Sequence, residues 1–267
     1  MSSLFQVLKY NPEINEGYLR HLILNTYRMY RKKFFSKYGE LVICHDSTNY
    51  WRKDFFPQYK ANRKKALEKS GLNWNELFSI MDKIRDEIKE TFPYKNIKVS
   101  RLEADDVIAC LCREFHDKEK ILILSSDKDF QQLQRYENVD QYSPLKKEFL
   151  VCDDPEHHLL YHIIKGDASD GVPNLLSDDD TFVVEDKRQK PCGKKAVDKV
   201  LKEIDQWKET ENWKRNQTII DLHSLPEKYR QEVNEVYNSQ VEKTRSKLLS
   251  YFIEHKLKNL IGSIEEF

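Results

Sequence analysis

Two short, unbroken apolar runs limit the fold of this chain more than any other feature of its sequence. They are Leu41–Cys44 and Ile121–Leu124, and an aspartate follows each within three residues, Asp46 and Asp127. Runs of this kind are typical of strands buried on both faces of a parallel sheet. Because ligands bind beyond the carboxyl ends of such strands, we expect the two aspartates at the same edge of the sheet.

Helical periodicity fills the stretches between and after these runs. The spacing of apolar residues predicts helices over 73–92, 102–115, 155–165, 194–204, 226–237 and 241–256. Two further strands are predicted over 96–100 and 148–152. Strands that alternate with helices predict an α/β fold with a mostly parallel central sheet flanked by helices.

The character of the chain changes near residue 166. Residues 166–193 are polar, turn-rich and without periodicity, and most of the chain after them is amphipathic helix. We therefore expect two domains, an α/β core over residues 1–165 and a helical region over residues 166–267.

The composition favours a soluble protein of a reducing compartment. No uncharged apolar run approaches the ~18–20 residues that cross a bilayer, and the first residues do not resemble a secretory signal. The five cysteines are an odd number without a C-x-x-C motif, which fits a cytoplasmic location.

The zero net charge conceals a separation of positive and negative residues. Lys+Arg and Asp+Glu each number 45, yet residues 17–39 hold six basic side chains and no acidic one. Residues 51–69 hold seven basic side chains and two acidic ones, with aromatic residues between the cations. Cations neutralise phosphates and aromatic rings stack on bases, so this segment is expected to contact nucleic acid. A solvated helix face would explain the charge but not the aromatic residues.

Acidic residues gather after the predicted strands and at the start of the helix 102–115. The members of this set are Asp46, Glu103, Asp105, Asp106, Asp127, Asp129, Asp167 and Asp170. Each alone could be an ordinary helix cap, but carboxylates that converge on one place need cations beside them. Oxygen ligands suit Mg²⁺ or Mn²⁺. Two such ions ~3.5–4 Å apart support phosphodiester hydrolysis.

Two histidines, His158 and His162, lie four residues apart on the predicted helix 155–165. A zinc site is the weaker interpretation, because no third ligand stands near them in the sequence. We expect them to be surface histidines of the helix.

The motifs of this chain, in their order, resemble those of the 5′-nuclease superfamily. They are the strand before Asp46, W-R at 51–52, Y-K-A-N-R at 59–63, E-A-D-D at 103–106, S-S-D-K-D-F at 125–130 and G-D-A-S-D-G-V-P at 166–173. The superfamily contains flap endonucleases, the 5′-3′ exonuclease domains of bacterial DNA polymerases, and phage 5′-exonucleases. R-H-L-I-L-N at 20–25, Y-W-R-K-D-F at 50–55 and I-E-E-F at 264–267 are most similar to the T-even phage ribonuclease H branch. The likeness covers nearly the whole chain.

The resemblance implies a PIN-like 5′-nuclease fold with a helical arch over about residues 50–92. It implies that one metal is held by Asp46, Glu103, Asp105 and Asp127, with Asp106 nearby, and a second by Asp129, Asp167 and Asp170. The implied catalytic residues are Lys60, Arg63, Asp46 and Asp127. The implied nucleic-acid contacts, with Tyr59 as a stacking residue, are Arg52, Tyr59, Lys60, Arg63, Lys64, Gly193, Lys194 and Lys195.

The family also begins with a buried strand that ends in a metal-binding aspartate. Alignment on residues 20–25 puts that strand before Met1. Two explanations stay open: the sequence is truncated, or this protein has a depleted metal site.

By this resemblance we expect a Mg²⁺-dependent, structure-specific 5′-nuclease of phage replication. It would remove RNA primers and 5′ flaps from duplex DNA as a monomer in the cytoplasm of an infected bacterium, with a single-strand-binding protein or sliding clamp as partner. The main alternative is a DNA-junction-binding protein of the same fold without catalysis. A topoisomerase-primase-like or phosphatase-like domain also carries D-x-D after a strand, but does not call for a basic, aromatic segment like 51–65.

Overall fold

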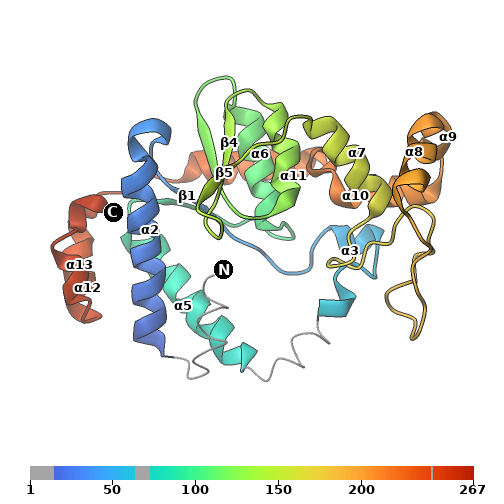
Figure 1. The fold of residues 1–267 in the computed structure, drawn as a ribbon. Coiled ribbons are helices and arrows are strands. Elements are labelled where there is room, and N and C mark those ends of the chain that lie inside the picture. Colours follow the sequence, from blue (N-terminus) through green and yellow to red (C-terminus); the bar gives the residue numbers. More distant parts are fainter. Residues whose placement is uncertain (1–14, 64–72, 242) are drawn as a thin grey trace. The chain divides into compact units, whose positions relative to one another are not determined.

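Strands and helices alternate along the chain, which a computed structural model describes over residues 15–63, 73–241 and 243–267 (Figure 1). The chain divides into two units that interleave in sequence. Unit 1 takes its described residues from 1–44, 71–97 and 235–267, and unit 2 from 45–70 and 98–234. The α/β class with largely parallel strand pairing is confirmed.

Unit 1 joins a short parallel strand pair to helices around an aromatic core. Its elements are α2 (Glu16–Tyr38), β1 (Val42–Cys44), α5 (Trp74–Thr91), β2 (Lys95–Ile97), η3 (Arg245–Lys247), α12 (Leu248–Glu254), α13 (Lys258–Ile261) and η4 (Ile264–Glu266). β1 pairs with β2 in register Val42 to Lys95. Phe92 lies in the core, and its ring centroid is 5.6 Å from that of Phe267.

Unit 2 holds a three-stranded sheet with helices packed beside it. Its elements are α3 (Arg52–Phe55), α6 (Ala104–Phe115), β3 (Ile121–Leu124), η1 (Lys128–Arg135), β4 (Val139–Ser143), β5 (Glu148–Leu150), α7 (Pro155–Lys165), α8 (Lys194–Lys202), α9 (Ile204–Lys208), α10 (Glu211–Ile220), η2 (Leu222–Ser224) and most of α11 (Glu227–Ser239). β3 pairs in parallel with β4, and β4 pairs antiparallel with β5. The described strands thus form two sheets, one in each unit, whereas the crossover pattern predicts one central sheet.

Local sequence signals explain where the helix beside the acidic loop begins and ends. Asp154 caps α7 by accepting a hydrogen bond from the backbone N–H of His157, and Pro155 occupies the first turn. The helix stops at Gly166, whose φ of 65° suits glycine. A Cβ there would lie 2.4 Å from the carbonyl oxygen of Val172, so only glycine fits. α7 therefore has the bounds that the sequence predicts.

The loop after α7 is held by a backbone bridge and by buried polar side chains. Asp167 and Val172 exchange two backbone hydrogen bonds of 2.8 Å. Asn216, fully buried on α10, donates to the carbonyls of Ile163 and Pro173. The start of the 166–193 segment is thus well fixed although its sequence shows no periodicity. No helix in the described parts of the chain is long and apolar enough to span a bilayer.

Candidate metal and nucleic-acid site

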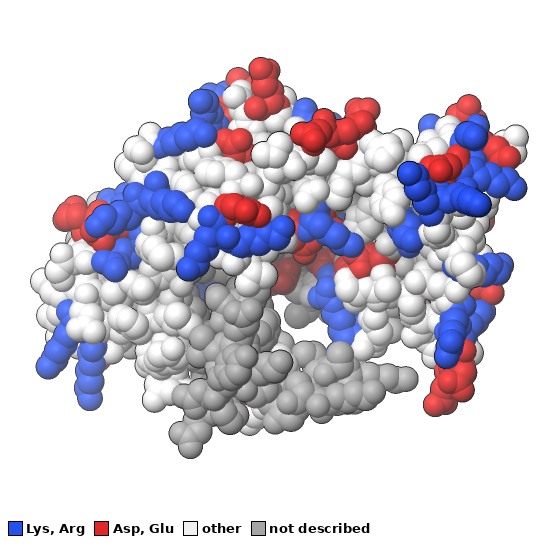
Figure 2. Space-filling view, in the orientation of Figure 1, with Lys and Arg blue, Asp and Glu red and all other residues white. Residues whose placement is uncertain are grey.

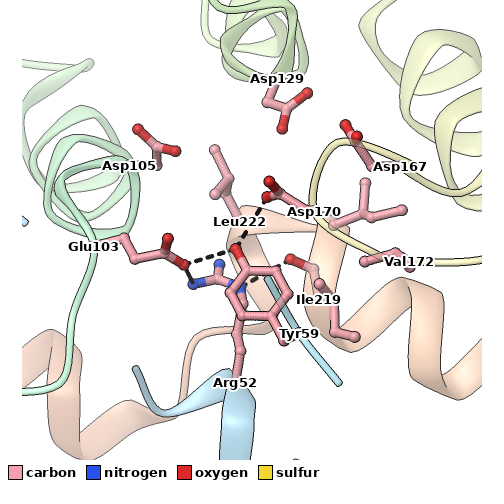
Figure 3. A pocket seen from close by; sticks show the side chains of 11 residues that line it. Arg52, Tyr59, Glu103, Asp105, Asp129, Asp167, Asp170, Val172, Ile219 and Leu222 are labelled. Atoms are coloured by element: carbon pink, nitrogen blue, oxygen red, sulfur yellow. Dashed lines mark hydrogen bonds and ion pairs between the residues drawn. The ribbon is translucent and has the colours of Figure 1, made fainter. Parts of the chain in front are cut away.

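Acidic side chains from separate segments of unit 2 surround one pocket (Figure 3). Its lining includes Glu103, Asp105, Asp129, Asp167 and Asp170. Asp46 and Asp127 lie beside this lining, because Asp46 Oδ1 accepts from the backbone N–H of Ala104, next to Glu103 and Asp105, and Asp127 Oδ1 accepts from the backbone N–H of Asp129. The structure therefore brings together seven of the eight acids that the sequence singles out, and Asp106 is the exception discussed below.

The start of α6 fixes the position of Asp46. The backbone N–H of Ala104, in the first turn of α6, donates to Asp46 Oδ1 at 2.9 Å. The N–H groups of a first helical turn have no partner within the helix, so carboxylates satisfy them well. This bond draws Asp46 to the turn that carries Glu103 and Asp105.

Strand β4 fixes the turn that carries Asp127. Gln141 is fully buried and donates to the carbonyl oxygens of Ser125 and Asp127 at 3.0 and 2.7 Å. Asp127 Oδ1 in turn accepts from the backbone N–H of Asp129 at 3.0 Å. Gln141 on the neighbouring strand thereby fixes the positions of Asp127 and Asp129, the two acids of the D-K-D motif.

Asp106 points away from the pocket into a buried ion pair. Arg52 donates to Asp106 Oδ2 and Oδ1 at 2.8 and 2.7 Å, and Trp51 Nε1 donates to the same carboxylate at 3.2 Å. Arg52 also donates to Glu103 and to the carbonyl of Ile219. The side chains of Arg52 and Asp106 are 3% and 0% exposed. In this structure Asp106 and Arg52 are each other's partners, and the metal role of Asp106 and the nucleic-acid role of Arg52 stay predictions.

Tyr59 is buried where a stacking residue was expected. Its ring is 3% exposed, and its O–H group lies 2.8 Å from Glu103 Oε2 and 3.2 Å from Asp170 Oδ2. Burial raises the pKa of Tyr59 above its ordinary value, so the hydroxyl stays neutral and can donate a hydrogen bond. In this structure Tyr59 orients two site carboxylates and does not offer its ring to a base.

Lys60 and Arg63 place positive charge beside the acids. Lys60 Nζ pairs with Glu103 and lies 3.5 Å from Asp170 Oδ2, and Arg63, half exposed, pairs with Asp170. Burial would lower the pKa of Lys60, but the charges of Glu103 and Asp170 raise it. Lys64, the next predicted contact, lies outside the described residues.

The segment that carries Lys60 approaches the acidic loop closely. The backbone N–H of Lys60 donates to the carbonyl of Asp170 at 2.8 Å, and Lys60 has a φ of 59°. Next to it Gly171 has a φ of 74°, and a Cβ there would lie 3.3 Å from the carbonyl oxygen of Gln58. This contact holds the cation at the pocket.

His162 is a site residue that the sequence interpretation missed. It is 6% exposed, so the expectation of a surface histidine is wrong for it. His162 Nδ1 lies 3.5 Å from Asp129 Oδ1 and Nε2 lies 3.3 Å from Asp167 Oδ2. Lys128, between the two acids of D-K-D, was also missed, and its Nζ lies 3.1 Å from Asp167 Oδ2. The spacing of five residues between His162 and Asp167, across a helix end, is the only signal for this contact.

The pocket carries more negative charge than its own cations offset. Burial, and then the charges of Asp127 and Glu103, raise the pKa of Asp105 to about 8. Burial likewise raises the pKa of Asp129 to about 6, although the neighbouring His162 lowers it. Asp129 Oδ1 is buried and has no hydrogen-bond partner among the described residues. A divalent cation would supply the missing charge and a partner for this oxygen, so the donor set fits such an ion.

The other predicted nucleic-acid contacts lie at the start of α8. The helix begins directly after Gly193, and its lysines at 194, 195, 199 and 202 are exposed. Figure 2 shows Lys and Arg side chains over the part of unit 2 drawn around α8. The sequence around Gly193 thus presents a cationic helix start to solvent.

Two family models together, and one relative alone, match this chain over nearly its whole length. Residues 10–158 match the 5′-3′ exonuclease N-terminal resolvase-like domain, and residues 153–267 match the T4 RNase H C-terminal domain. The chain is 35% identical over 269 residues to ribonuclease H of Enterobacteria phage T4, across 96% of this chain and 88% of that protein. It is 26% identical to a 5′-3′ exonuclease of Buchnera aphidicola subsp. Schizaphis graminum, across 64% of this chain and 59% of that protein.

Solved structures share the fold. A bacteriophage T5 5′-exonuclease with bound zinc superposes with a TM-score of 0.60 at 18% identity, over 87% of this chain and 95% of the other. A bacteriophage T5 flap endonuclease in a complex with DNA and metal ions gives a TM-score of 0.51 at 17% identity, over 80% and 91%. The predicted resemblance is confirmed, and the chain belongs to the 5′-3′ exonuclease family, with a C-terminal domain of the T4 ribonuclease H type.

Proposed function

We propose that this chain is a structure-specific 5′-3′ nuclease that uses Mg²⁺ or Mn²⁺ to remove RNA primers and 5′ flaps during phage-type DNA replication. The observation that carries the proposal is the convergence of Glu103, Asp105, Asp129, Asp167 and Asp170 on one pocket. Family membership gives the reaction class, hydrolysis of phosphodiesters.

Two divalent ions, when bound, would supply the positive charge that lets water attack a phosphodiester. We propose that one ion is held by Asp46, Glu103, Asp105 and Asp127, because Asp105 is buried and the negative charges of the other three act on its carboxyl. Asp129, Asp167 and Asp170 are proposed to hold the second. The raised pKa of Asp105 supports this assignment, because a bound cation relieves that repulsion.

Lys60 and Arg63 are proposed to offset the charge of the substrate phosphate. Both cations lie against site acids, Lys60 against Glu103 and Arg63 against Asp170. A substrate phosphate that entered the pocket would meet the two cations at the edge of the pocket. The cations would then pair with phosphate oxygens in place of the carboxylates. The exposed lysines at the start of α8 are proposed to bind the duplex backbone through Lys194, Lys195 and the Gly193 amide.

The test is cleavage of 5′-labelled flap DNA and RNA–DNA duplex by the full chain with Mg²⁺. We expect short 5′ products that EDTA abolishes, and a loss of more than about 100-fold in Asp127→Asn, since even groups that only support a ligand give 10–100-fold. The matched control is Asp153→Asn, an exposed acid on the loop before α7, which should cleave at the wild-type rate.

Two outcomes would contradict the proposal. If wild type and Asp127→Asn both bind flaps and neither cleaves, the chain is the junction-binding protein without catalysis. If the Asp153→Asn control loses as much activity as Asp127→Asn, the pocket is not the site of cleavage. A monomeric state, a cytoplasmic location, and a single-strand-binding protein or sliding clamp as partner stay predictions.

A further inference from the structure

A buried imidazole faces two carboxylates of the pocket, and the proposed chemistry gives it no role. His162 lies in the last turn of α7, with Nδ1 3.5 Å from Asp129 Oδ1 and Nε2 3.3 Å from Asp167 Oδ2. One donor atom from each of the three residues lies within 4.8 Å of the others. Ligands at about 2.1 Å from one ion are separated by up to about 4.2 Å, so small side-chain movements would bring all three onto one cation.

Asp167 has hydrogen-bond partners besides the His162 ring, whereas Asp129 Oδ1 has none among the described residues. Asp167 Oδ1 accepts from the backbone N–H of Ser169 at 2.8 Å and from its hydroxyl at 2.5 Å, and Lys128 Nζ lies 3.1 Å from Oδ2. Asp167 is therefore satisfied without the imidazole. Asp129 Oδ1, by contrast, is buried and accepts no hydrogen bond from a described residue. His162 Nε2 shares a hydrogen bond of 3.3 Å with Asp167 Oδ2, so an ion bound at Nδ1 would give Asp129 Oδ1 a partner and would leave that bond in place.

The backbone holds His162 firmly in this position. Its carbonyl accepts the capping N–H of Gly166 at 2.9 Å, and the next carbonyl, that of Ile163, accepts from the buried Asn216 at 2.7 Å. α7 also packs against η1, which carries Asp129. A ligand on a helix that is fixed at both faces is positioned more accurately than one on a loop.

We propose that His162 is a ligand of the ion held by Asp129 and Asp167, and that it makes this position favour a first-row transition ion over Mg²⁺. Carboxylates alone suit Mg²⁺, whereas imidazole nitrogen suits transition ions. The two proposed ions would then have different ligands, one only carboxylate oxygens and the other carboxylate oxygens and an imidazole nitrogen. This inference rests on the proposed function only in treating the pocket as a metal site.

The first experiment measures Co²⁺ binding and Mg²⁺ binding to the metal-free full chain by isothermal titration calorimetry. His162→Asn should weaken Co²⁺ binding at one site by about 10–100-fold and change Mg²⁺ affinity by less than about 3-fold. The matched control is His158→Asn, one helical turn earlier, whose ring lies 6.3 Å from that of His162. It should leave both affinities unchanged.

The second experiment identifies the ligand directly. The Co²⁺-loaded chain should show an exchangeable, hyperfine-shifted imidazole N–H proton that disappears in His162→Asn and persists in His158→Asn. His162→Gln, which fills more of the ring's volume, replaces the asparagine variant if that variant fails to fold.

Two results would overturn the inference: unchanged Co²⁺ affinity in His162→Asn, or an equal fall in Co²⁺ and Mg²⁺ affinity, which would mean that His162 only positions the carboxylates. Failure of the proposed function is separate. It would appear as no cleavage by wild type with Mg²⁺, whatever the Co²⁺ spectrum shows.

Discussion

Arg52 shows how one residue can match a family motif and yet serve the fold. Its guanidinium and the Asp106 carboxylate form a two-bond ion pair in the interior of unit 2, with a further bond to the carbonyl of Ile219 on α10. Burial by itself would lower the pKa of Arg52, but the Asp106 charge raises it. The pair ties α3 to the first turn of α6 and thereby supports Glu103 at the pocket.

Removing this guanidinium should destabilise the protein strongly. Arg52→Ala leaves Asp106 charged and buried without its cation, although Trp51 Nε1 and the Glu103 backbone N–H still donate to it, so the free energy of unfolding should fall by about 3–5 kcal/mol. The control is Lys53→Ala at the exposed neighbouring position, which should change it by less than about 1 kcal/mol. Urea denaturation followed by circular dichroism measures both. A stable Arg52→Ala protein with weakened DNA binding would instead assign Arg52 to the substrate.

The sequence indicates that the acids of the pocket gather in one place, because they follow strand ends and helix starts. It does not indicate which way each side chain points. Asp105 and Asp106 are adjacent, and the phase of α6 turns the first to the pocket and the second to Arg52. The local pattern could not reveal His162 either, because its burial depends on how α7 packs against η1. Contacts made by tertiary packing carry no fixed spacing along the chain.

At the scale of elements, unit 1 relies on a polar contact among three helices. Glu87 of α5 accepts from Arg20 of α2 at 2.8 Å and from the Tyr251 hydroxyl of α12 at 2.7 Å. Burial would raise the pKa of Glu87, but these hydrogen bonds lower it below the ordinary value of 4.5. A folded-state pKa below the unfolded one stabilises the protein above pH 4.5, and that contribution disappears as the pH falls through the folded-state pKa.

Glu87→Gln should therefore destabilise the protein in a pH-dependent way. We expect a loss of about 1–3 kcal/mol in the free energy of unfolding at about pH 7, and a much smaller difference from wild type at about pH 3. Glu90→Gln, at an exposed position of the same helix, should show little effect at either pH. Urea titrations at both pH values give the comparison. An equal difference at both would show that the charge of Glu87 does not matter.

Elements with local signals were predicted well, and those without them were missed. α7 has an aspartate cap, a proline in its first turn and a glycine stop, so its predicted bounds are confirmed. β4 was missed because it carries the fully buried Gln141 and Ser143 where alternation predicts apolar residues. α2 was missed because its buried side chains include Arg20 and Arg31, which pair with Glu87 and Glu40 outside the helix.

At the scale of the whole molecule, balanced charge coexists with strong local charge. Lysines and arginines equal the acids in number, yet acids line the pocket while Lys194 and Lys195 open α8. Binding to a polyanion follows local charge and not the sum. The salt dependence of DNA binding should therefore report on the cationic helix start.

We expect the double variant Lys194→Ala/Lys195→Ala to bind duplex DNA more weakly and with less dependence on salt. Each lost phosphate contact reduces the slope of log affinity against log salt by about 0.9, so a decrease of about 1–2 is expected. Lys118→Ala/Lys120→Ala removes the same charge from exposed positions after α6 and should leave the slope unchanged. Fluorescence anisotropy in EDTA at several KCl concentrations measures it. Equal decreases in both variants would show that only overall charge matters.

The interleaving of the two units has a consequence for how the chain matures on the ribosome. Unit 2, with the acidic pocket, consists of residues up to Asn234, whereas unit 1 includes residues 235–267. Phe252 and Phe267 from that last segment are fully buried beside Phe92. During translation all residues of unit 2 are therefore made before the last segment of unit 1, whose aromatic interior stays incomplete until residues 235–267 have been added.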